Sequence, residues 1–146
     1  MTSDAPVPRT SAYLLDTGPI IAVLDRGDQW HAWARTAVSA LDAPVLTCEP
    51  VVTEAWFLAR RGGGDPARVL DLLAALDVQV VPAWRPRTDA LLRRYADRVS
   101  VADASLLALA EEADGRVVVT TDRDDFAVYR IHRRRMVPAL VPSVRP

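Results

Sequence analysis

The stretch that decides the fold is VVVTTD, residues 117–122. An uninterrupted run of β-branched residues is typical of a strand buried on both faces of a parallel sheet. A second short apolar run, AYLLD, covers residues 12–16. Both runs end in an aspartate. The two runs therefore predict buried strands whose carboxyl ends carry Asp16 and Asp122.

Outward from these runs, strands alternate with helices. Further short strands are predicted at residues 45–47, 78–81 and, weakly, 136–141. Glycine, proline and capping residues bound seven predicted helices, near residues 18–26, 29–41, 50–61, 66–76, 86–98, 101–113 and 123–130. This alternation predicts the α/β class: a single-domain α/β/α sandwich with a central, mostly parallel sheet. Sheets of this kind carry their sites at the carboxyl ends of the strands.

Length and composition limit the possible functions. The chain has 146 residues and a net charge of −1, and all of its 18 basic residues are arginine. The absence of lysine excludes a Walker-type phosphate loop and Schiff-base catalysis. It also excludes receiver domains and haloacid-dehalogenase-type phosphatases, which use a lysine in the site. A single cysteine and two histidines exclude a disulfide framework and a zinc cluster.

The first eleven residues, MTSDAPVPRTS, are polar and contain two prolines. They lack the apolar segment of a signal peptide. No run approaches the roughly 18 apolar residues of a membrane span. We therefore expect a flexible tail over residues 1–11, one domain over residues 12–142, a cytoplasmic location and no membrane association.

Two carboxylates interrupt apolar helix faces. Glu54 shares its face with Val51 and Leu58, which predicts a carboxylate set against apolar surroundings. Asp103 is followed on its face by Leu106 and Leu107, although Ser100 and Asp103 also fit a capping box. Asp16 and Asp122 could equally be helix caps. Asp97, near the predicted end of the preceding helix, is a possible auxiliary acid.

Four carboxylates on separate elements can converge on one point. Without counter-charge they would repel each other, since two unit charges about 4 Å apart cost roughly 4 kcal/mol at an effective dielectric constant of about 20. Oxygen ligands of this kind suit Mg²⁺ or Mn²⁺ rather than zinc. Acidic clusters that hold such ions hydrolyse phosphodiesters, because the metal activates a water and stabilises the leaving oxygen.

Four segments together resemble a known family. They are LLDTGPIIAVLD (14–25), VVTEAWFLA (51–59), YADRVSVADASLLALAEE (95–112) and VVVTTDRDDFAVYR (117–130). In order, spacing and placement of acids they resemble PIN-domain nucleases, and more narrowly the VapC-type toxins of bacterial toxin–antitoxin pairs. The resemblance extends from about residue 12 to about residue 130.

The resemblance implies an Mg²⁺-dependent endoribonuclease, with Mn²⁺ as a possible substitute. The acidic quartet of the family matches Asp16, Glu54, Asp103 and Asp122, as catalytic residues and metal ligands. Its polar helpers match Thr17 and Thr120. The family also implies an RNA substrate, a small antitoxin that blocks the site, and a homodimer. Two alternatives stay open: a non-toxin PIN nuclease in RNA processing, and a catalytically silent PIN-like module that binds protein.

Basic residues gather near the end of the chain. Residues 123–146 contain six arginines and two aspartates, a local charge of +4 against −5 for the remainder. Arginine holds phosphates through bidentate contacts, so Arg123 and Arg130 are candidates for substrate binding. A solvated surface or a protein-docking face explains the segment equally well. We expect Asp124 and Asp125 to cap or brace the short helix that follows Asp122.

Overall fold

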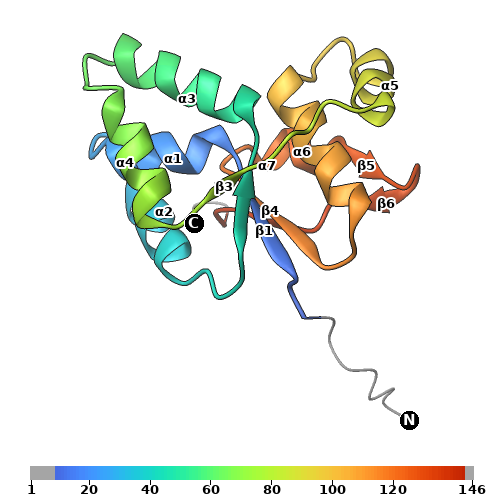
Figure 1. Cartoon of the computed structure of the whole chain (residues 1–146), viewed down its shortest axis with the longest axis horizontal. Helices are drawn as coiled ribbons and strands as arrows, with labels where there is room; N and C mark the ends of the chain where they lie inside the picture. Colours follow the sequence, from blue (N-terminus) through green and yellow to red (C-terminus); the bar gives the residue numbers. More distant parts are fainter. Residues whose placement is uncertain (1–8, 144–146) are drawn as a thin grey trace.

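The structure is a computed structural model that describes residues 9–143. Its elements alternate as the sequence predicts (Figure 1). The strands are β1 (Ala12–Leu15), β2 (Val45–Thr47), β3 (Gln79–Val80), β4 (Arg116–Val119), β5 (Arg130–Ile131), β6 (Arg135–Met136) and β7 (Ala139–Leu140). The helices are α1 (Thr17–Leu24), α2 (His31–Ser39), α3 (Glu49–Arg61), α4 (Ala67–Ala75), α5 (Pro86–Arg94), α6 (Val101–Glu112) and α7 (Arg123–Val128). No helix among the described residues is long and apolar enough to cross a membrane.

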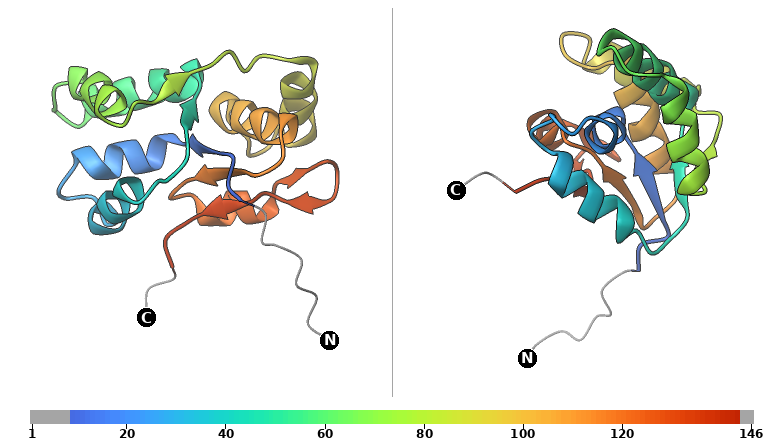
Figure 2. Two further views of the ribbon diagram at one scale, coloured as in Figure 1. Left: turned by 60° about the horizontal axis from the view of Figure 1, so that its bottom comes forward. Right: turned by 90° about the vertical axis from the view of Figure 1, so that its left-hand side faces the viewer.

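Five strands form one parallel sheet in the order β3-β2-β1-β4-β7. The connections from β1 to β3 run toward one edge of the sheet and contain α1–α4. The next connection, through α5 and α6, returns across the sheet to β4. Right-handed crossovers therefore place α1–α4 on one face and α5–α6 on the other, as Figure 2 shows. The predicted α/β/α sandwich is confirmed.

The sheet order creates a switch point between β1 and β4. These neighbours pair in register, with Leu15 opposite Val119, but their chains leave toward opposite edges of the sheet. Open parallel sheets bind ligands in the crevice at such a point. Residues at the carboxyl ends of β1 and β4 are therefore where a site is expected.

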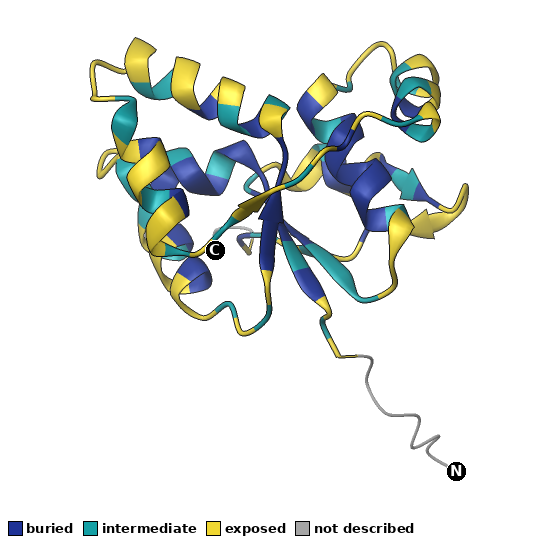
Figure 3. Cartoon of the chain, viewed as in Figure 1, coloured by how far each residue is buried: buried dark blue, intermediate teal, exposed yellow. Residues whose placement is uncertain are grey.

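The core explains why these strands and α6 form the centre of the domain. Leu14, Leu15, Val118 and Val119 are fully buried. Helix α6 is buried along almost its whole length, from Ala104 to Ala110, and Figure 3 shows it as a dark band beside the sheet. A helix that is apolar on all sides fits this position. The core thus fixes the first turn of α6 close to the ends of β1 and β4.

Several predicted boundaries are wrong in detail. Helix α5 ends at Arg94 rather than at residue 98, and residues 95–98 form a turn instead. Strand β4 ends at Val119, three residues before Asp122. The predicted strand at 136–141 shortens to β7, and the antiparallel pair β5–β6 was not predicted. Its strands have two residues each, too few to show an alternating pattern.

Most of the predicted tail, residues 1–8, lies outside the described residues. At its inner end, the Ser11 backbone N–H donates to the Gly115 carbonyl over 2.8 Å, and the Ser11 hydroxyl donates to the Asp114 carbonyl over 2.7 Å. Ser11 is therefore attached to the loop before β4. The division into a tail and a domain over 12–142 stays a prediction.

Candidate metal centre

One cleft collects all four predicted acids. Its volume is about 310 Å³, and it opens at the switch point between β1 and β4. The residues that line it are Asp16, Thr17, Gly18, Glu54, Leu58, Arg98, Ser100, Asp103, Thr121, Asp122 and Asp125. We call it the acidic cleft. Its carboxylates come from the loop after β1, from α3, from α6 and from the start of α7.

Asp16 forms the buried floor of the acidic cleft. Only 6% of its surface is exposed. One carboxylate oxygen accepts the Thr17 N–H over 2.7 Å, and the other accepts the Thr120 hydroxyl over 2.7 Å. Burial raises the pKa of Asp16 to about 6; the two hydrogen bonds oppose the rise, while the charges of Glu54 and Asp122 add to it. Asp16 is also the N-cap of α1, so capping and cleft positions coincide.

Thr120 links two acids of the cleft. Its hydroxyl donates to Asp16 and accepts the Asp122 N–H over 3.0 Å. Thr17 makes a comparable link, because its hydroxyl donates to Glu54 over 3.3 Å while its N–H donates to Asp16. Both predicted polar helpers thus lie against the predicted acids. Their hydrogen bonds fix the orientation of carboxylates that would otherwise rotate freely.

Asp103 is held from two sides. The Asp103 backbone N–H donates to the Ser100 hydroxyl over 3.0 Å, and Ser100 is the N-cap of α6 as predicted. Its carboxylate accepts the Tyr129 hydroxyl over 2.9 Å, and the Tyr129 residue is fully buried. Burial, followed by the charge of Asp16, raises the pKa of Asp103 to about 7. No pattern in the sequence indicated that Tyr129 would reach this acid.

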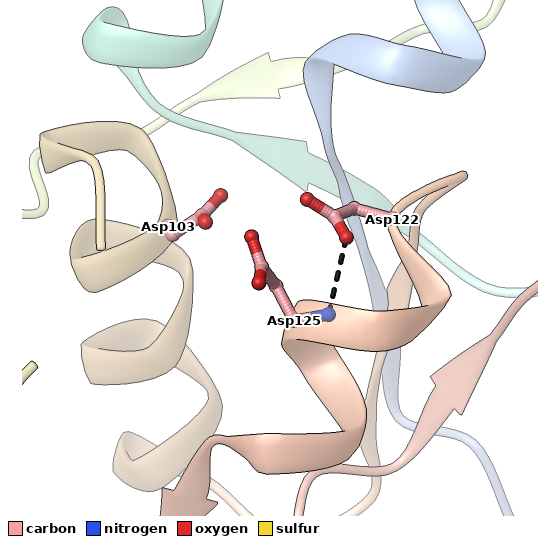
Figure 4. A group of neighbouring side chains, drawn as sticks. All are labelled: Asp103, Asp122 and Asp125. Atoms are coloured by element: carbon pink, nitrogen blue, oxygen red, sulfur yellow. Dashed lines mark hydrogen bonds between the residues drawn. The ribbon is translucent and has the colours of Figure 1, made fainter. Parts of the chain in front are cut away.

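Asp122 and Asp125 form the wall opposite Asp103. Asp122 caps α7, because its carboxylate accepts the Asp125 N–H over 3.1 Å (Figure 4). Asp103, Asp122 and Asp125 each offer a carboxylate oxygen, and these three oxygens lie within 4.8 Å of one another. Asp125, which we expected to cap or brace the helix, thus also brings its carboxylate beside Asp103 and Asp122. Its position three residues after Asp122, one helical turn away, is a signal that could have placed it there.

Glu54 differs from the expectation drawn from its helix. Its face contains buried Val51 and half-buried Leu58, but Glu54 itself is exposed. The carboxylate therefore lies at the rim of the acidic cleft rather than within an apolar stripe. The rotation of α3 about its own axis determines whether Glu54 faces the core or solvent. The spacing of apolar residues along the helix does not determine that rotation closely enough.

Other predicted residues fall outside the acidic cleft. Asp97 is exposed in the turn after α5 and does not line it. Arg130 does not line the cleft, and one of its guanidinium nitrogens donates to the carbonyls of Ala127, Val128 and Tyr129; its assignment to substrate binding stays a prediction. Arg123 is exposed next to Asp122 and lines a neighbouring cleft. Asp124 is also exposed and lies in that neighbouring cleft.

Comparison with known proteins agrees with this geometry. The sequence pattern of the PIN domain matches residues 13–131. The chain belongs to the PIN domain family. No curated protein sequence matches it significantly.

Two solved structures resemble this PIN domain. One is VapC20 from Mycobacterium tuberculosis, described as a sarcin-ricin loop cleaving toxin; it is 24% identical, the match covers 77% of this chain and 91% of that chain, and the TM-score is 0.65. The other is VapBC2 from Rickettsia felis, bound to a DNA fragment from their promoter. It is 11% identical, the match covers 89% of this chain and 98% of that chain, and the TM-score is 0.57. Because both sequence identities are below 25%, the similarity to these two structures establishes a shared fold and no more.

The donor set of this PIN domain fits a hard divalent cation. Five carboxylates and the Thr17 and Thr120 hydroxyls supply only oxygen, which is the ligand type of Mg²⁺ and Mn²⁺. Within residues 9–143, Arg98 is the one basic side chain that lines the cleft; its guanidinium lies 3.8 Å from Asp125, and no pattern in the sequence pointed to it. Burial is the main cause of the raised pKa values of Asp16 and Asp103, and the charges of neighbouring carboxylates raise both pKa values further. A divalent cation would offset the charges of these carboxylates.

Proposed function

We propose that this PIN domain is a metal-dependent endoribonuclease and the toxin of a toxin–antitoxin pair. The observation that carries the proposal is the acidic cleft itself, where five carboxylates with one arginine surround the switch point of a parallel sheet. Support also comes from the fold shared with VapC20, which is described as a toxin that cleaves the sarcin-ricin loop. The catalytic domain in this proposal is residues 12–142, and its place of action is the cytoplasm, where RNA is translated.

In this proposal Asp16, Glu54, Asp103 and Asp122 hold Mg²⁺ or Mn²⁺. The bound ion supplies Lewis-acid chemistry, which neutralises phosphate charge and activates water. Asp16 is the most rigid ligand, since both of its oxygens are hydrogen-bonded. Asp125 adds a fifth carboxylate within reach of Asp103 and Asp122. Glu54, at the exposed rim, is the ligand best placed to change its contacts when RNA enters.

The described Cys48 and His31 side chains argue against a covalent mechanism. Cys48 is buried, and burial raises the pKa of its thiol to about 11, so it is not a nucleophile near neutral pH. The Nδ1–H of His31 donates to the Ala22 carbonyl over 2.7 Å, which ties α2 to α1 outside the acidic cleft. The reaction we assign is therefore hydrolysis, for which the carboxylates of the acidic cleft would hold the ion that supplies water activation.

The partner in this proposal is a small antitoxin that covers the acidic cleft, and the family resemblance also implies a homodimer. VapBC2, which shares this fold, is described as bound to a DNA fragment from their promoter, and this supports a partner protein for the chain. A catalytically silent protein-binding module would not need five converging carboxylates. A housekeeping RNA-processing nuclease would use the same cleft, so expression separates the two: a toxin arrests growth, and co-expression of the adjacent small gene restores it.

The direct test is RNA cleavage by the purified protein. We expect cleavage in Mg²⁺ or Mn²⁺, loss in EDTA, and loss in Asp16→Asn with the fold retained. Asp97→Asn is the matched control, because it makes the same chemical change at an exposed aspartate outside the cleft. Equal cleavage by wild type and Asp16→Asn would overturn the proposal.

A further inference from the structure

A second cleft adjoins the acidic cleft. Its volume is about 510 Å³, and it shares Thr121 and Asp122 with the acidic cleft. Its other walls include Gln29, Trp30 and Arg123. We propose that this cleft is a nucleotide subsite that binds one unstacked base of single-stranded RNA beside the phosphate to be cut. The inference rests on the proposed nuclease function and adds how the substrate is recognised.

Trp30 supplies a held aromatic surface. The backbone N–H of Trp30 donates to the Asp28 carboxylate over 2.8 Å, and the backbone carbonyl of Trp30 accepts the Ala34 N–H over 2.8 Å. The next residue, His31, is hydrogen-bonded to α1. Trp33 packs against the hydrophobic core, whereas Trp30 is half-buried and lines the second cleft. These hydrogen bonds fix the backbone that carries Trp30, whose ring lines the cleft and offers a surface on which a base can stack.

Arg123 supplies the contact to the backbone. It is exposed, follows Asp122 directly in the chain, and forms no salt bridge to another residue within 9–143. A guanidinium in this position can bind the phosphate next to the one at the metal centre. Trp30 comes from the loop before α2 and Arg123 from the start of α7, so a nucleotide bound between them contacts two separate segments of the domain.

The charge of the second cleft favours a base over a bare phosphate chain. Asp122 and Asp124 line it together with Arg123, so the acidic side chains outnumber the basic one and the cleft is not a basic groove. The Gln29 amide and the Asp124 carboxylate can instead exchange hydrogen bonds with the edge of a base. Such edges are free only in unpaired RNA, because loops and single strands present splayed bases. The ligand class is therefore single-stranded RNA, not a duplex.

Binding of labelled RNA to the inactive Asp16→Asn protein tests this inference. Trp30→Ala should weaken binding of a single-stranded oligonucleotide about 5- to 100-fold, which is the range that stacking of one base gives. Trp30→Phe should keep most of the affinity, while Trp30→Leu, of similar apolar character but without a π face, should lose it. Trp84→Ala is the control, because Trp84 is 66% exposed and lines neither cleft. Arg123→Ala should reduce the slope of log affinity against log salt by about 0.7.

The outcomes separate the two proposals. In otherwise wild-type protein, Trp30→Leu should raise KM for cleavage while leaving Mg²⁺ affinity unchanged. If Trp30→Leu and Trp30→Phe bind single-stranded RNA alike and as tightly as the parent, the subsite is refuted and the nuclease proposal stands. If the Trp30 variants lose affinity for the antitoxin but not for RNA, the cleft docks protein and the subsite is likewise refuted. If wild type cuts no RNA with any divalent metal, the proposed function itself falls.

Discussion

Neutralising Asp16 should stabilise the metal-free protein. The carboxylate is 6% exposed, and its pKa rises from 3.8 to about 6 on folding. The folded state thus binds this proton more tightly than the unfolded chain does. The contribution of Asp16 to the free energy of unfolding is therefore largest below pH 4, and this contribution is lost as the pH rises through about 6. Above that pH the charged Asp16 costs the fold about 3 kcal/mol.

Asp16→Asn removes this cost but alters one hydrogen bond. The asparagine oxygen still accepts the Thr17 N–H, while its amide must donate to the Thr120 hydroxyl instead of accepting from it. Thr120 then accepts two hydrogen bonds, including that of Asp122, and its own proton loses a partner. A lost hydrogen bond of this kind costs about 1–2 kcal/mol. We therefore expect a net gain of about 1–2 kcal/mol at pH 8.

Urea unfolding in EDTA measures this gain. The difference in free energy of unfolding between Asp16→Asn and wild type should be positive at pH 8 and should shrink or change sign at pH 4. With saturating Mg²⁺ the order should reverse, because wild type gains about 2.7 kcal/mol at 100 times Kd and the variant gains little. Asp97→Asn should match wild type throughout. A variant less stable than wild type in EDTA at pH 8, or a difference independent of pH, would refute the reasoning.

Three further predictions concern contacts around the acidic cleft. Tyr129→Phe removes the hydroxyl that orients Asp103 but keeps the ring, so calorimetric Mg²⁺ affinity should fall about 10- to 100-fold while the melting temperature changes little; unchanged affinity would show that the contact is only structural. Gly18→Ala would drive a Cβ into the Thr121 hydroxyl, and the free energy of unfolding in urea should fall by about 1–3 kcal/mol. Arg98→Ala removes the cation of the cleft, so Mg²⁺ should bind more tightly, and weaker binding would contradict this expectation.

The sequence predicted the backbone of the site well. Buried parallel strands appear as short apolar runs, so β1 and β4 were evident, and the aspartates that follow them were placed correctly at the sheet edge. The cap of α6 at Ser100 followed from local spacing alone. Such features depend on residues close together in the chain, where pattern and propensity carry information.

The sequence predicted the orientation of side chains less well. Glu54 proved to be exposed, Asp125 joined the cluster, and Arg98 and Tyr129 reached the acidic cleft from elements that no pattern linked to it. Each of these outcomes depends on how one helix is rotated or docked against another. Tertiary packing sets that rotation, and the periodicity of a single segment does not contain it.

The position of β4 in the sheet sets the time at which the cleft can form during synthesis. Asp16 and Glu54 leave the ribosome early, but β4 must insert beside β1 before Thr120 and Asp122 can meet Asp16. Tyr129, which holds Asp103, follows later still. Domains fold as units during synthesis, so a nascent chain that ends before this region carries no assembled centre. The centre that the proposed nuclease activity requires is therefore absent until most of the chain has emerged.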